Sequence, residues 1–372
     1  MNTNKLKELI KKDIILIVSL LLALISCFFS IPKLEYIDFK VLILLFNLMI
    51  VIAAFKELKI LDNIAINLLK KCTSLFSLNL ILVLLTFFAS MLVTNDVALI
   101  TFIPITIIIS KKCNINILKT VIFQTIAANL GSSFTPMGNP QNLYIYSFYN
   151  LKPTEFFKVT SPLVFISLLF LFFIVAKNKN KEILFKLDNV QITDKKVALI
   201  FILLFFIILL SVFHLINYKL VFLITIVTVI FTNKKLFLKV DYSLLLTFIG
   251  FFIFIGNISA LDNVRIFMKS ILNSKESTFI TSIVSSQFIS NVPATMLLSN
   301  FTNYIPELLL GVNIGGLGTL IASLASVISY KFYSNEFPNE TTKYLRFFTI
   351  YNICGLAILI PIIYLFISKI NI

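Results

Sequence analysis

The chain has 372 residues, of which 59% are hydrophobic and only 13% are charged. Soluble globular domains are about 45–50% apolar and about 25% charged, so this composition excludes an ordinary soluble protein. The formal net charge is +15, but the lysines fall in short clusters between apolar runs. That pattern is typical of loops in a membrane protein, and it argues against nucleic acid as a partner. With four scattered cysteines and one histidine, no metal site built from these residues is expected.

Repeated apolar runs of nearly 20 residues predict an all-α polytopic membrane protein, because a bilayer crossing needs about 20 apolar residues. The first run follows a basic segment and has no cleavage signal after it, so it is interpreted as an uncleaved span. We expect about ten helical spans plus two re-entrant hairpins. In chain order, the uninterrupted spans are predicted at 13–31, 39–55, 159–176, 197–213, 219–231, 242–260 and 346–368.

The order of elements occurs twice, which predicts two structural repeats. Residues 1–176 form the first half, with a re-entrant hairpin at about 74–110 and a broken helix at about 116–149. After a cytoplasmic linker at 177–196, residues 197–372 form the second half, with a hairpin at about 277–303 and a broken helix at about 304–330. Three short sequence echoes support the pairing, including Asn129-Leu130-Gly131 with Asn313-Ile314-Gly315. An odd number of crossings separates the halves, so the second repeat is predicted to be inverted, as in many secondary transporters.

The distribution of positive charge predicts the orientation in the membrane. With a cytoplasmic N-terminus, the inside segments carry a net charge of +13 and the outside segments +3. The inside segments are 1–13, 56–71, 111–119, 177–196, 234–241 and 331–346. Cytoplasmic loops carry the excess of Lys and Arg, so we expect a multi-pass protein of the cytoplasmic membrane with its N-terminus inside.

Asp96 is the one acid that the sequence places inside the membrane. A carboxylate in hydrocarbon costs at least a few kcal/mol and is tolerated mainly where it faces protein, water or a cation. Together with Ser90, Thr94 and Asn95, it forms a cluster of hard oxygen ligands at the predicted tip of the first hairpin. Such a cluster suits Na⁺ or a proton on Asp96. In the second hairpin, Ser286, Ser290 and Asn291 form the matching cluster without an acid, and Pro293 fits the first turn of a restarting helix. For any single Ser or Thr, a bond back to its own helix is an equal alternative.

Two glycine-rich stretches interrupt the predicted broken helices. The stretch 131–142 contains two Gly and two Pro, which disfavour helix. Unwound carbonyls here suit a cation, and the helix restarting near Pro140 suits an anion. An extracellular loop is the alternative. In the second half, four glycines between Gly311 and Gly318 precede Thr319, and a small-residue helix-packing face is the competing explanation.

These motifs resemble those of the ion transporter superfamily, which includes divalent anion–sodium symporters, citrate transporters, arsenite permeases and NhaD-type sodium–proton antiporters. The resemblance rests on Thr94-Asn95-Asp96-Val97-Ala98, on Thr135-Pro136-Met137-Gly138-Asn139-Pro140-Gln141-Asn142, and on Ser290-Asn291-Val292-Pro293. It covers nearly the whole chain. It implies hairpin tips that bind substrate and ions between the halves, elevator-type motion, and a scaffold that is commonly dimeric.

Carried over residue by residue, the resemblance implies two ion sites and a substrate site. Coupling Na⁺ or H⁺ is assigned to Ser90, Thr94, Asn95, Asp96, Gly131, Ser132, Ser133, Ser286, Ser290, Asn291 and Gly318. Substrate is assigned to Asn95, Asp96, Thr135, Pro136, Asn139, Asn291, Pro293 and Thr319. Dicarboxylate symporters carry Ser-Asn-Thr at both tips, whereas Asp96 and Val292 stand at the third positions here.

The sequence therefore predicts a secondary active transporter that moves a small ion, expected to be an anion such as citrate or arsenite, coupled to Na⁺ or H⁺. No cofactor is expected apart from bound Na⁺, and the expected partners are the substrate ion, the lipid bilayer and a second copy of the chain. A sodium–proton antiporter is the alternative within transporters. A membrane enzyme is disfavoured because the chain has few titratable residues for chemistry at the membrane surface, and a passive channel is a further rival.

Overall fold

The computed structural model describes residues 14–177, 181–183 and 187–367. Regular secondary structure in these residues is helical, apart from an isolated antiparallel bridge between Ser74 and Glu182. Within the described residues, six helical segments are long and apolar enough to cross a membrane, which confirms the predicted all-helical, multi-pass architecture. They are α3 (Phe39–Glu57), α5 (Leu75–Val93), α9 (Pro153–Ala176), α10 (Lys195–Val212), α12 (Tyr242–Ser259) and the segment Pro338–Ile367, which contains α18 (Thr341–Ile367).

Most of the other helices are shorter. They are α2 (Ile14–Ser26), α4 (Ile60–Leu69), α6 (Asn95–Cys113), α7 (Leu118–Gly131), α8 (Pro140–Phe148), α11 (Tyr218–Thr232), α13 (Asp262–Ile271), α14 (Lys275–Ile289), α15 (Asn291–Ser299), α16 (Ile305–Ile314) and α17 (Leu324–Glu336).

Polar residues at the ends of apolar runs set where several helices begin. Asp38, Asp194, Asn217 and Asp241 each accept a hydrogen bond from a backbone N–H in the first turn of α3, α10, α11 and α12. Such N-caps satisfy donors that a helix leaves unpaired. α9 begins at Pro153, earlier than the predicted start at residue 159, because proline suits the first helical position and the Glu155 side chain accepts from the backbone N–H of Lys152.

Two helix pairs are each joined by a single non-helical residue. Thr94 joins α5 to α6, and Ser290 joins α14 to α15. α5 and α6 have 19 residues each, about 28 Å at 1.5 Å per residue. α14 and α15 have 15 and 9 residues, so the second pair is the shorter one.

Non-helical stretches separate α7 from α8 and α16 from α17. α7 ends at Gly131, a short 3₁₀ turn covers Ser132–Phe134, and α8 begins at Pro140. In the second half, α16 ends at Ile314 and α17 begins at Leu324. The residues at the first break are almost entirely buried, whereas Thr319 and Ile321 at the second break are exposed. The backbone at both breaks is not helical.

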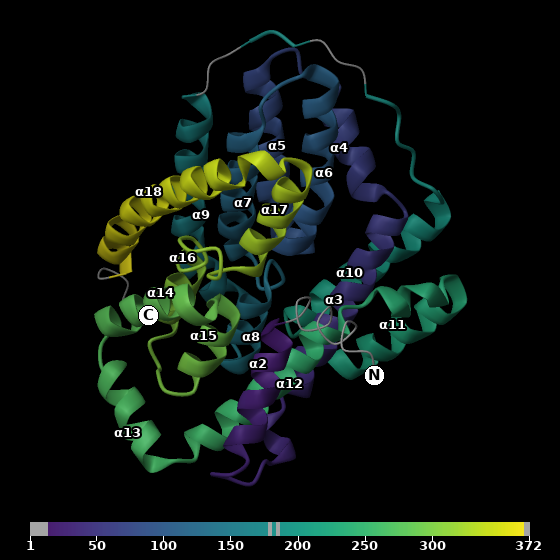
Figure 1. Cartoon of the computed structure of the whole chain (residues 1–372). Helices are drawn as coiled ribbons and strands as arrows, with labels where there is room; N and C mark the ends of the chain where they lie inside the picture. Colours follow the sequence, from purple (N-terminus) through teal and green to yellow (C-terminus); the bar gives the residue numbers. More distant parts are fainter. Residues whose placement is uncertain (1–13, 178–180, 184–186, 368–372) are drawn as a thin grey trace, which may run out of the picture.

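Two large hydrophobic clusters divide the packing. One, the core bundle, joins α5–α7, α9 and α14–α18, and the other, the flanking bundle, joins α3 and α10–α12. α8 contributes to both, since Ile145 and Tyr146 pack in the core bundle and Leu143 and Tyr144 pack in the flanking bundle. In Figure 1, α3, α10 and α11 group on one side, whereas α14, α15 and α16 lie on the other. α8 therefore lies between the two bundles and packs against both.

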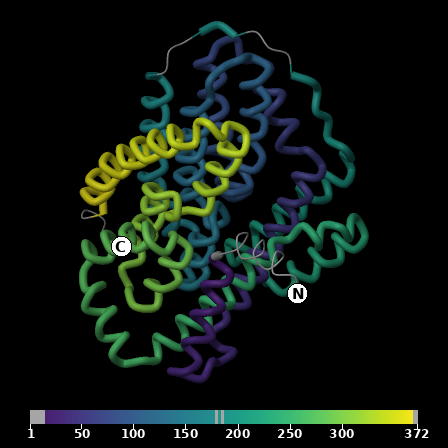
Figure 2. Tube along the Cα trace, viewed as in Figure 1, coloured from purple at the N-terminus to yellow at the C-terminus, as the bar shows by residue number. Residues whose placement is uncertain are grey.

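Two parts of the connection from α9 to α10 are described, residues 181–183 and 187–194. Residues 181–183 lie at the end of the molecule formed by α4, α5 and α6 (Figure 1, Figure 2). The backbone N–H of Leu75 donates to the carbonyl of Lys181, and that of Ile183 donates to the carbonyl of Thr73. Further along, the N–H of Thr193 donates to the carbonyl of Leu58. The described parts of the connection are thus bound to the start of α5 and to Leu58, the residue that follows α3.

Candidate functional site

The turn between α5 and α6 has an unusual backbone. Thr94 has φ 75° and ψ 152°, a backbone conformation that residues other than glycine rarely adopt. The next N–H, of Asn95, donates to the carbonyl of Gly138 at 3.1 Å. The turn is therefore attached to the non-helical stretch that precedes α8.

The turn between α14 and α15 has the same construction. Ser290 has φ 73° and ψ 153°, and the N–H of Asn291 donates to the carbonyl of Ala322 at 3.0 Å. Here the anchor is the non-helical stretch that precedes α17. Both turns thus use an Asn that starts a helix and binds the backbone of the neighbouring interruption.

The two turns meet at one small cavity of about 30 Å³. Asn95 and Asp96 line it from the first turn, and Ser290, Asn291 and Pro293 line it from the second. A water molecule needs roughly 10–15 Å³ of such space, so the cavity has room for water or a small cation. The structure therefore brings together five of the residues that sequence analysis assigned to the tips, whereas Ser90, Thr94 and Ser286 do not line this cavity.

Side-chain amides link the two halves of the core bundle beside this cavity. Asn129 Oδ1 accepts from Asn95 Nδ2 at 3.3 Å and from the Ser323 hydroxyl at 2.9 Å. Its Nδ2 donates to the carbonyl of Gly316 at 3.2 Å. Asn129 is buried, so these bonds satisfy an amide that would otherwise be costly to bury.

A second amide group crosses between the halves farther along α8. Asn139 Nδ2 donates to Asn313 Oδ1 at 3.1 Å, and Asn313 Nδ2 donates to Asn142 Oδ1 at 2.7 Å. Asn142 Nδ2 also lies within 3.2 Å of the carbonyls of Ser132 and Ser133 and within 3.1 Å of that of Thr135. These carbonyls belong to the interruption between α7 and α8, so Asn142 fixes its unwound backbone.

Glycines let the helices beside each turn approach closely. A Cβ on Gly131 would lie 2.3 Å from the carbonyl oxygen of Phe87 and 2.7 Å from Ser90 Oγ. In the second half, a Cβ on Gly315 would lie 2.8 Å from Ser286 Oγ. Two of the predicted coupling-ion serines, Ser90 and Ser286, therefore pack against a glycine at a break.

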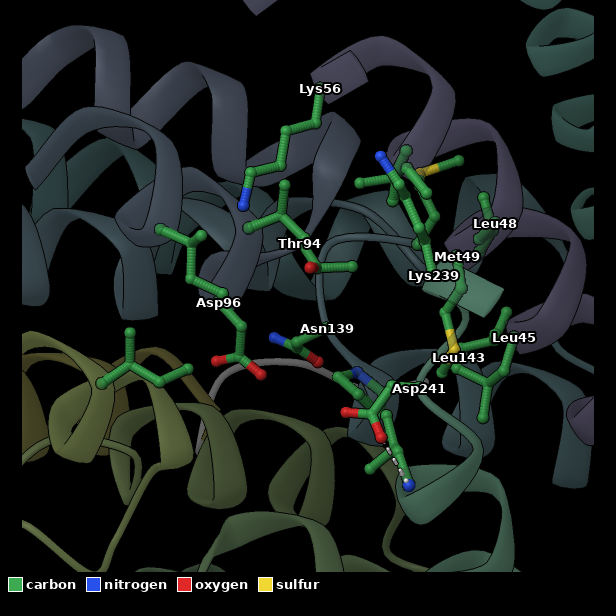
Figure 3. Close-up of a pocket in the computed structure, with 18 of the residues that line it drawn as sticks. Leu45, Leu48, Met49, Lys56, Thr94, Asp96, Asn139, Leu143, Lys239 and Asp241 are labelled. Carbon is green, nitrogen blue, oxygen red and sulfur yellow. Dashed lines mark hydrogen bonds between the residues drawn. The ribbon is translucent and has the colours of Figure 1, made fainter. Parts of the chain in front are cut away.

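Asp96 also lines a larger cavity of about 640 Å³ (Figure 3). Its Oδ1 is buried and accepts no hydrogen bond from the residues that the structure describes. The lining also includes Thr94 and Asn139, and it includes Lys56 from the last turn of α3 and Asp241 from the start of α12. Asp96 thus joins the small cavity between the turns to a wider space between the bundles.

The other predicted site residues are placed as follows. The hydroxyls of Ser90, Ser132 and Ser286 donate to backbone carbonyls three or four residues earlier. The hydroxyl of Ser133 does the same with Leu130, and that of Thr135 donates to the carbonyl of Met91. Pro136 is buried in the interruption before α8.

Thr319 and Gly318 line neither of the two cavities. Thr319 is exposed, and its hydroxyl donates to the carbonyl of Gln287. Gly318 has φ 110°, and a Cβ there would lie 2.1 Å from Gln287 Oε1.

Sequence analysis did not assign a role to Gln287, which organises this loop. Its Nε2 donates to the carbonyls of Gly315 and Leu317 at 2.8 and 3.0 Å, and its Oε1 accepts from the N–H of Thr319. The sequence feature that could have pointed to Gln287 is its position, one helical turn before Ser290, with a long amide side chain. Lys56 was assigned to an amphipathic segment, 56–72, along the cytoplasmic interface, and Lys239 and Asp241 to a further inside segment, although all three line the larger cavity.

Among the described residues, no three His, Cys, Asp or Glu side chains come together in a way that could hold a metal ion. The polar groups at the turns are amides, hydroxyls and one carboxylate on an otherwise apolar helical protein. These groups offer hard oxygen ligands of the kind that suit a hard cation.

Comparison with known proteins agrees with this geometry. The family model for citrate transporters matches residues 7–302, which include both turns and the first break. The chain belongs to the citrate transporter family. It is thus a multi-pass membrane transporter and not an enzyme, and its similarity to the superfamily named above is confirmed.

Individual relatives cover most of the chain. An uncharacterised transporter of Methanocaldococcus jannaschii is 37% identical over 319 residues, which is 84% of this chain and 86% of the relative. The inner membrane protein YbiR of Escherichia coli is 30% identical over 303 residues, 79% of this chain and 80% of the relative. A transporter of Dictyostelium discoideum named arsB is 32% identical over 126 residues, 33% of this chain and 22% of the relative.

Proposed function

We propose that this citrate-transporter-family protein is a secondary active transporter that moves a small anion across the cytoplasmic membrane, coupled to Na⁺ or H⁺. The anion is a carboxylate such as citrate, or arsenite. The observation that carries the proposal is that both turns and Asp96 line one small cavity, which adjoins a larger cavity through Asp96.

The coupling cation binds at the turns. Each turn offers an amide oxygen and hydroxyl oxygens, with Asp96 as the only acid at either turn. Ser90 and Ser286 donate their protons back to their own helices, which leaves oxygen lone pairs free to face a cation. The unpartnered Oδ1 of Asp96 takes a proton or contributes to a Na⁺ site.

The substrate anion binds next to the cation, near Asn95, Asn139 and Asn291. An ionised Asp96 close to an anion would repel it, by several kcal/mol at short range in a partly dry site. A bound cation or a proton removes that repulsion, so cation and anion bind together. This mutual dependence is the basis of coupling in the proposal.

The two helix pairs act as re-entrant hairpins of an inverted repeat, the first in residues 1–176 and the second in residues 197–372. The matching φ and ψ angles of Thr94 and Ser290 support the repeat, and so do the matching N–H bonds of Asn95 and Asn291. The core bundle moves against the flanking bundle, and α8 lies at the moving interface. The N-terminus lies in the cytoplasm, as the charge distribution favours, and the family resemblance supports a homodimer.

A sodium–proton antiporter is the second candidate. Three acids, Glu57, Asp96 and Asp241, line the larger cavity, and their presence favours this candidate. Sodium-dependent proton movement without any added anion would select this candidate.

The test is transport by the full-length protein in proteoliposomes, with citrate, succinate, arsenite, sulfate and Na⁺ offered under imposed Na⁺ or pH gradients. Asp96→Asn should abolish cation-coupled flux while leaving membrane insertion intact. Asp262→Asn, which changes an exposed acid on α13, is the matched control and should transport normally. Coupled flux at the wild-type level in Asp96→Asn would refute the role of Asp96.

A further inference from the structure

The larger cavity has an apolar wall on the flanking-bundle side. Five residues of α3 that point toward it are hydrocarbon or thioether side chains, namely Leu45, Leu48, Met49, Ile52 and Ala53. Met137 and Leu143 continue this surface beside α8. A fully hydrophilic ion such as citrate gains nothing from such a wall, whereas a hydrocarbon group loses water on contact with it.

Among the residues that the structure describes, Lys56 is the one cavity-lining cation that has no partner. It lies one turn beyond Ala53 on α3, and Figure 3 shows its side chain extending into the cavity on the side where Thr94 and Asp96 lie. It forms no hydrogen bond or ion pair with the residues that the structure describes. Lys239, in contrast, is bound to Glu57 at 2.8 Å.

The remaining cavity charges are already compensated. Glu57 has Lys239, and the Asp241 carboxylate accepts the N–H of Leu244 at the N-terminus of α12, whose dipole favours a negative charge. Asp96 is the cation or proton site of the proposed function. The unpaired charge that is left for a substrate is therefore the positive charge of Lys56.

From these contacts we infer that the cavity binds an amphipathic organic anion, with its anionic group at Lys56 and its hydrocarbon part on the α3 wall. The volume of about 640 Å³ is in the range of cavities that enclose organic ligands of drug size and exceeds what arsenite needs. This inference rests on the proposed function, in which the cavity is the substrate path. The inference narrows the small anion of the proposed function to an amphipathic one, which carries a hydrocarbon part as well as a charge.

Equilibrium binding tests the inference without any ion gradient. The full-length protein in lipid nanodiscs is titrated calorimetrically with ethane-, butane- and hexanesulfonate, and titrations of empty nanodiscs are subtracted. Sulfonates stay charged and cross bilayers poorly. Affinity should rise about threefold for each added methylene group, since each buried CH₂ contributes about 0.8 kcal/mol at most. Citrate and arsenite should bind more weakly than hexanesulfonate.

Three variants separate the two parts of the site. Lys56→Gln should weaken binding of all three sulfonates about tenfold and leave the dependence on chain length unchanged. Lys56→Arg should restore most of the affinity. Ala53→Leu, which fills space beside the wall, should weaken binding of hexanesulfonate and spare ethanesulfonate.

Lys59→Gln is the matched control, because Lys59 is exposed and does not line the cavity. It should bind like the wild type. Equal affinities across the series, or wild-type binding by Lys56→Gln, would overturn the inference, and the α3 wall would then be only a surface against which the core bundle packs. That result would leave the proposed function intact if Asp96→Asn still abolished coupled flux.

Discussion

Thr94 and Ser290, 196 positions apart in the chain, hold the same backbone conformation, with φ and ψ of 75° and 152° in one and 73° and 153° in the other. This region is nearly exclusive to glycine and costs other residues about 1–3 kcal/mol. Both turns carry this backbone strain, although glycine at either position would avoid it. Because both turns face one cavity, we infer that their hydroxyl side chains have a role there.

Thr94→Gly and Ser290→Gly should therefore stabilise the protein and impair transport. Relief of backbone strain exceeds the entropy cost of glycine, so the free energy of unfolding should rise by up to about 1 kcal/mol in each variant. Thermal unfolding in detergent measures this, and proteoliposome uptake should fall. Ser270→Gly in the exposed helix α13 is the control and should lose up to about 1 kcal/mol. Equal losses in all three variants would contradict the strain argument.

Gly131→Ala should destabilise the core bundle. The new Cβ would lie 2.3 Å from a backbone oxygen, that of Phe87, which cannot move without shifting α5. Overpacking of this kind costs about 1–3 kcal/mol or more, so the unfolding temperature should drop clearly. Gly355→Ala is the matched control, because its Cβ would meet only the end of the Leu317 side chain, at 3.1 Å. A Gly355 variant as unstable as the Gly131 variant would refute this reading.

Asn129→Ala should weaken the junction between the halves. It leaves the Asn95 amide and the Gly316 carbonyl without their partner, and each buried unsatisfied group costs about 1–3 kcal/mol. We expect a loss of about 2 kcal/mol or more in the free energy of unfolding and slower coupled uptake. Asn67→Ala, which removes an exposed amide on α4, should stay within about 0.5 kcal/mol of the wild type. Wild-type stability of Asn129→Ala would show that the network is dispensable.

His214, in the connection between α10 and α11, should make stability depend on pH. Burial lowers the pKa of His214 below its usual range, and the nearby Lys40 lowers the same pKa further. As the pH falls through about 6.5, the usual value for histidine, the unfolded chain takes up a proton that the folded protein resists, so stability decreases. Above that pH the effect vanishes. In His214→Gln, the unfolding temperature measured from about pH 7.5 down to about pH 5.5 should fall less steeply than in the wild type. Identical slopes would exclude His214 as the cause.

The sequence predicted the helical class and most spans because long apolar runs in a membrane protein have few alternative structures. It also located the two turns, because Thr94, Asn95 and Ser290, Asn291 are polar groups inside apolar runs. Ser74 and Ser274, 200 positions apart, begin α5 and α14 with the same capping box. This is a further parallel between the two helix pairs that is present in the sequence.

Tertiary relationships were beyond the sequence argument. The bonds of Asn313 to Asn139 and Asn142 join residues more than 170 positions apart, and nothing local specifies which amides will pair. Lys56 follows an apolar span directly, so it was assigned to an amphipathic segment at the cytoplasmic interface, whereas its position on the last turn of α3 brings it to the cavity. Thr319 was assigned to substrate through its glycine-rich surroundings, but it lies on the exposed side of the loop, where Gln287 binds it.

The junction between the halves of the core bundle consists largely of carboxamides, from Asn95, Asn129, Asn139, Asn142 and Asn313. Carboxamides neither gain nor lose protons across the acidity range of living cells. The junction therefore stays uncharged whether it is exposed to an acidic medium outside the cell or to a neutral cytoplasm. Any response of the transport cycle to external acidity must then arise at titratable side chains outside this junction, such as Asp96, while the framework that positions Asp96 stays chemically constant.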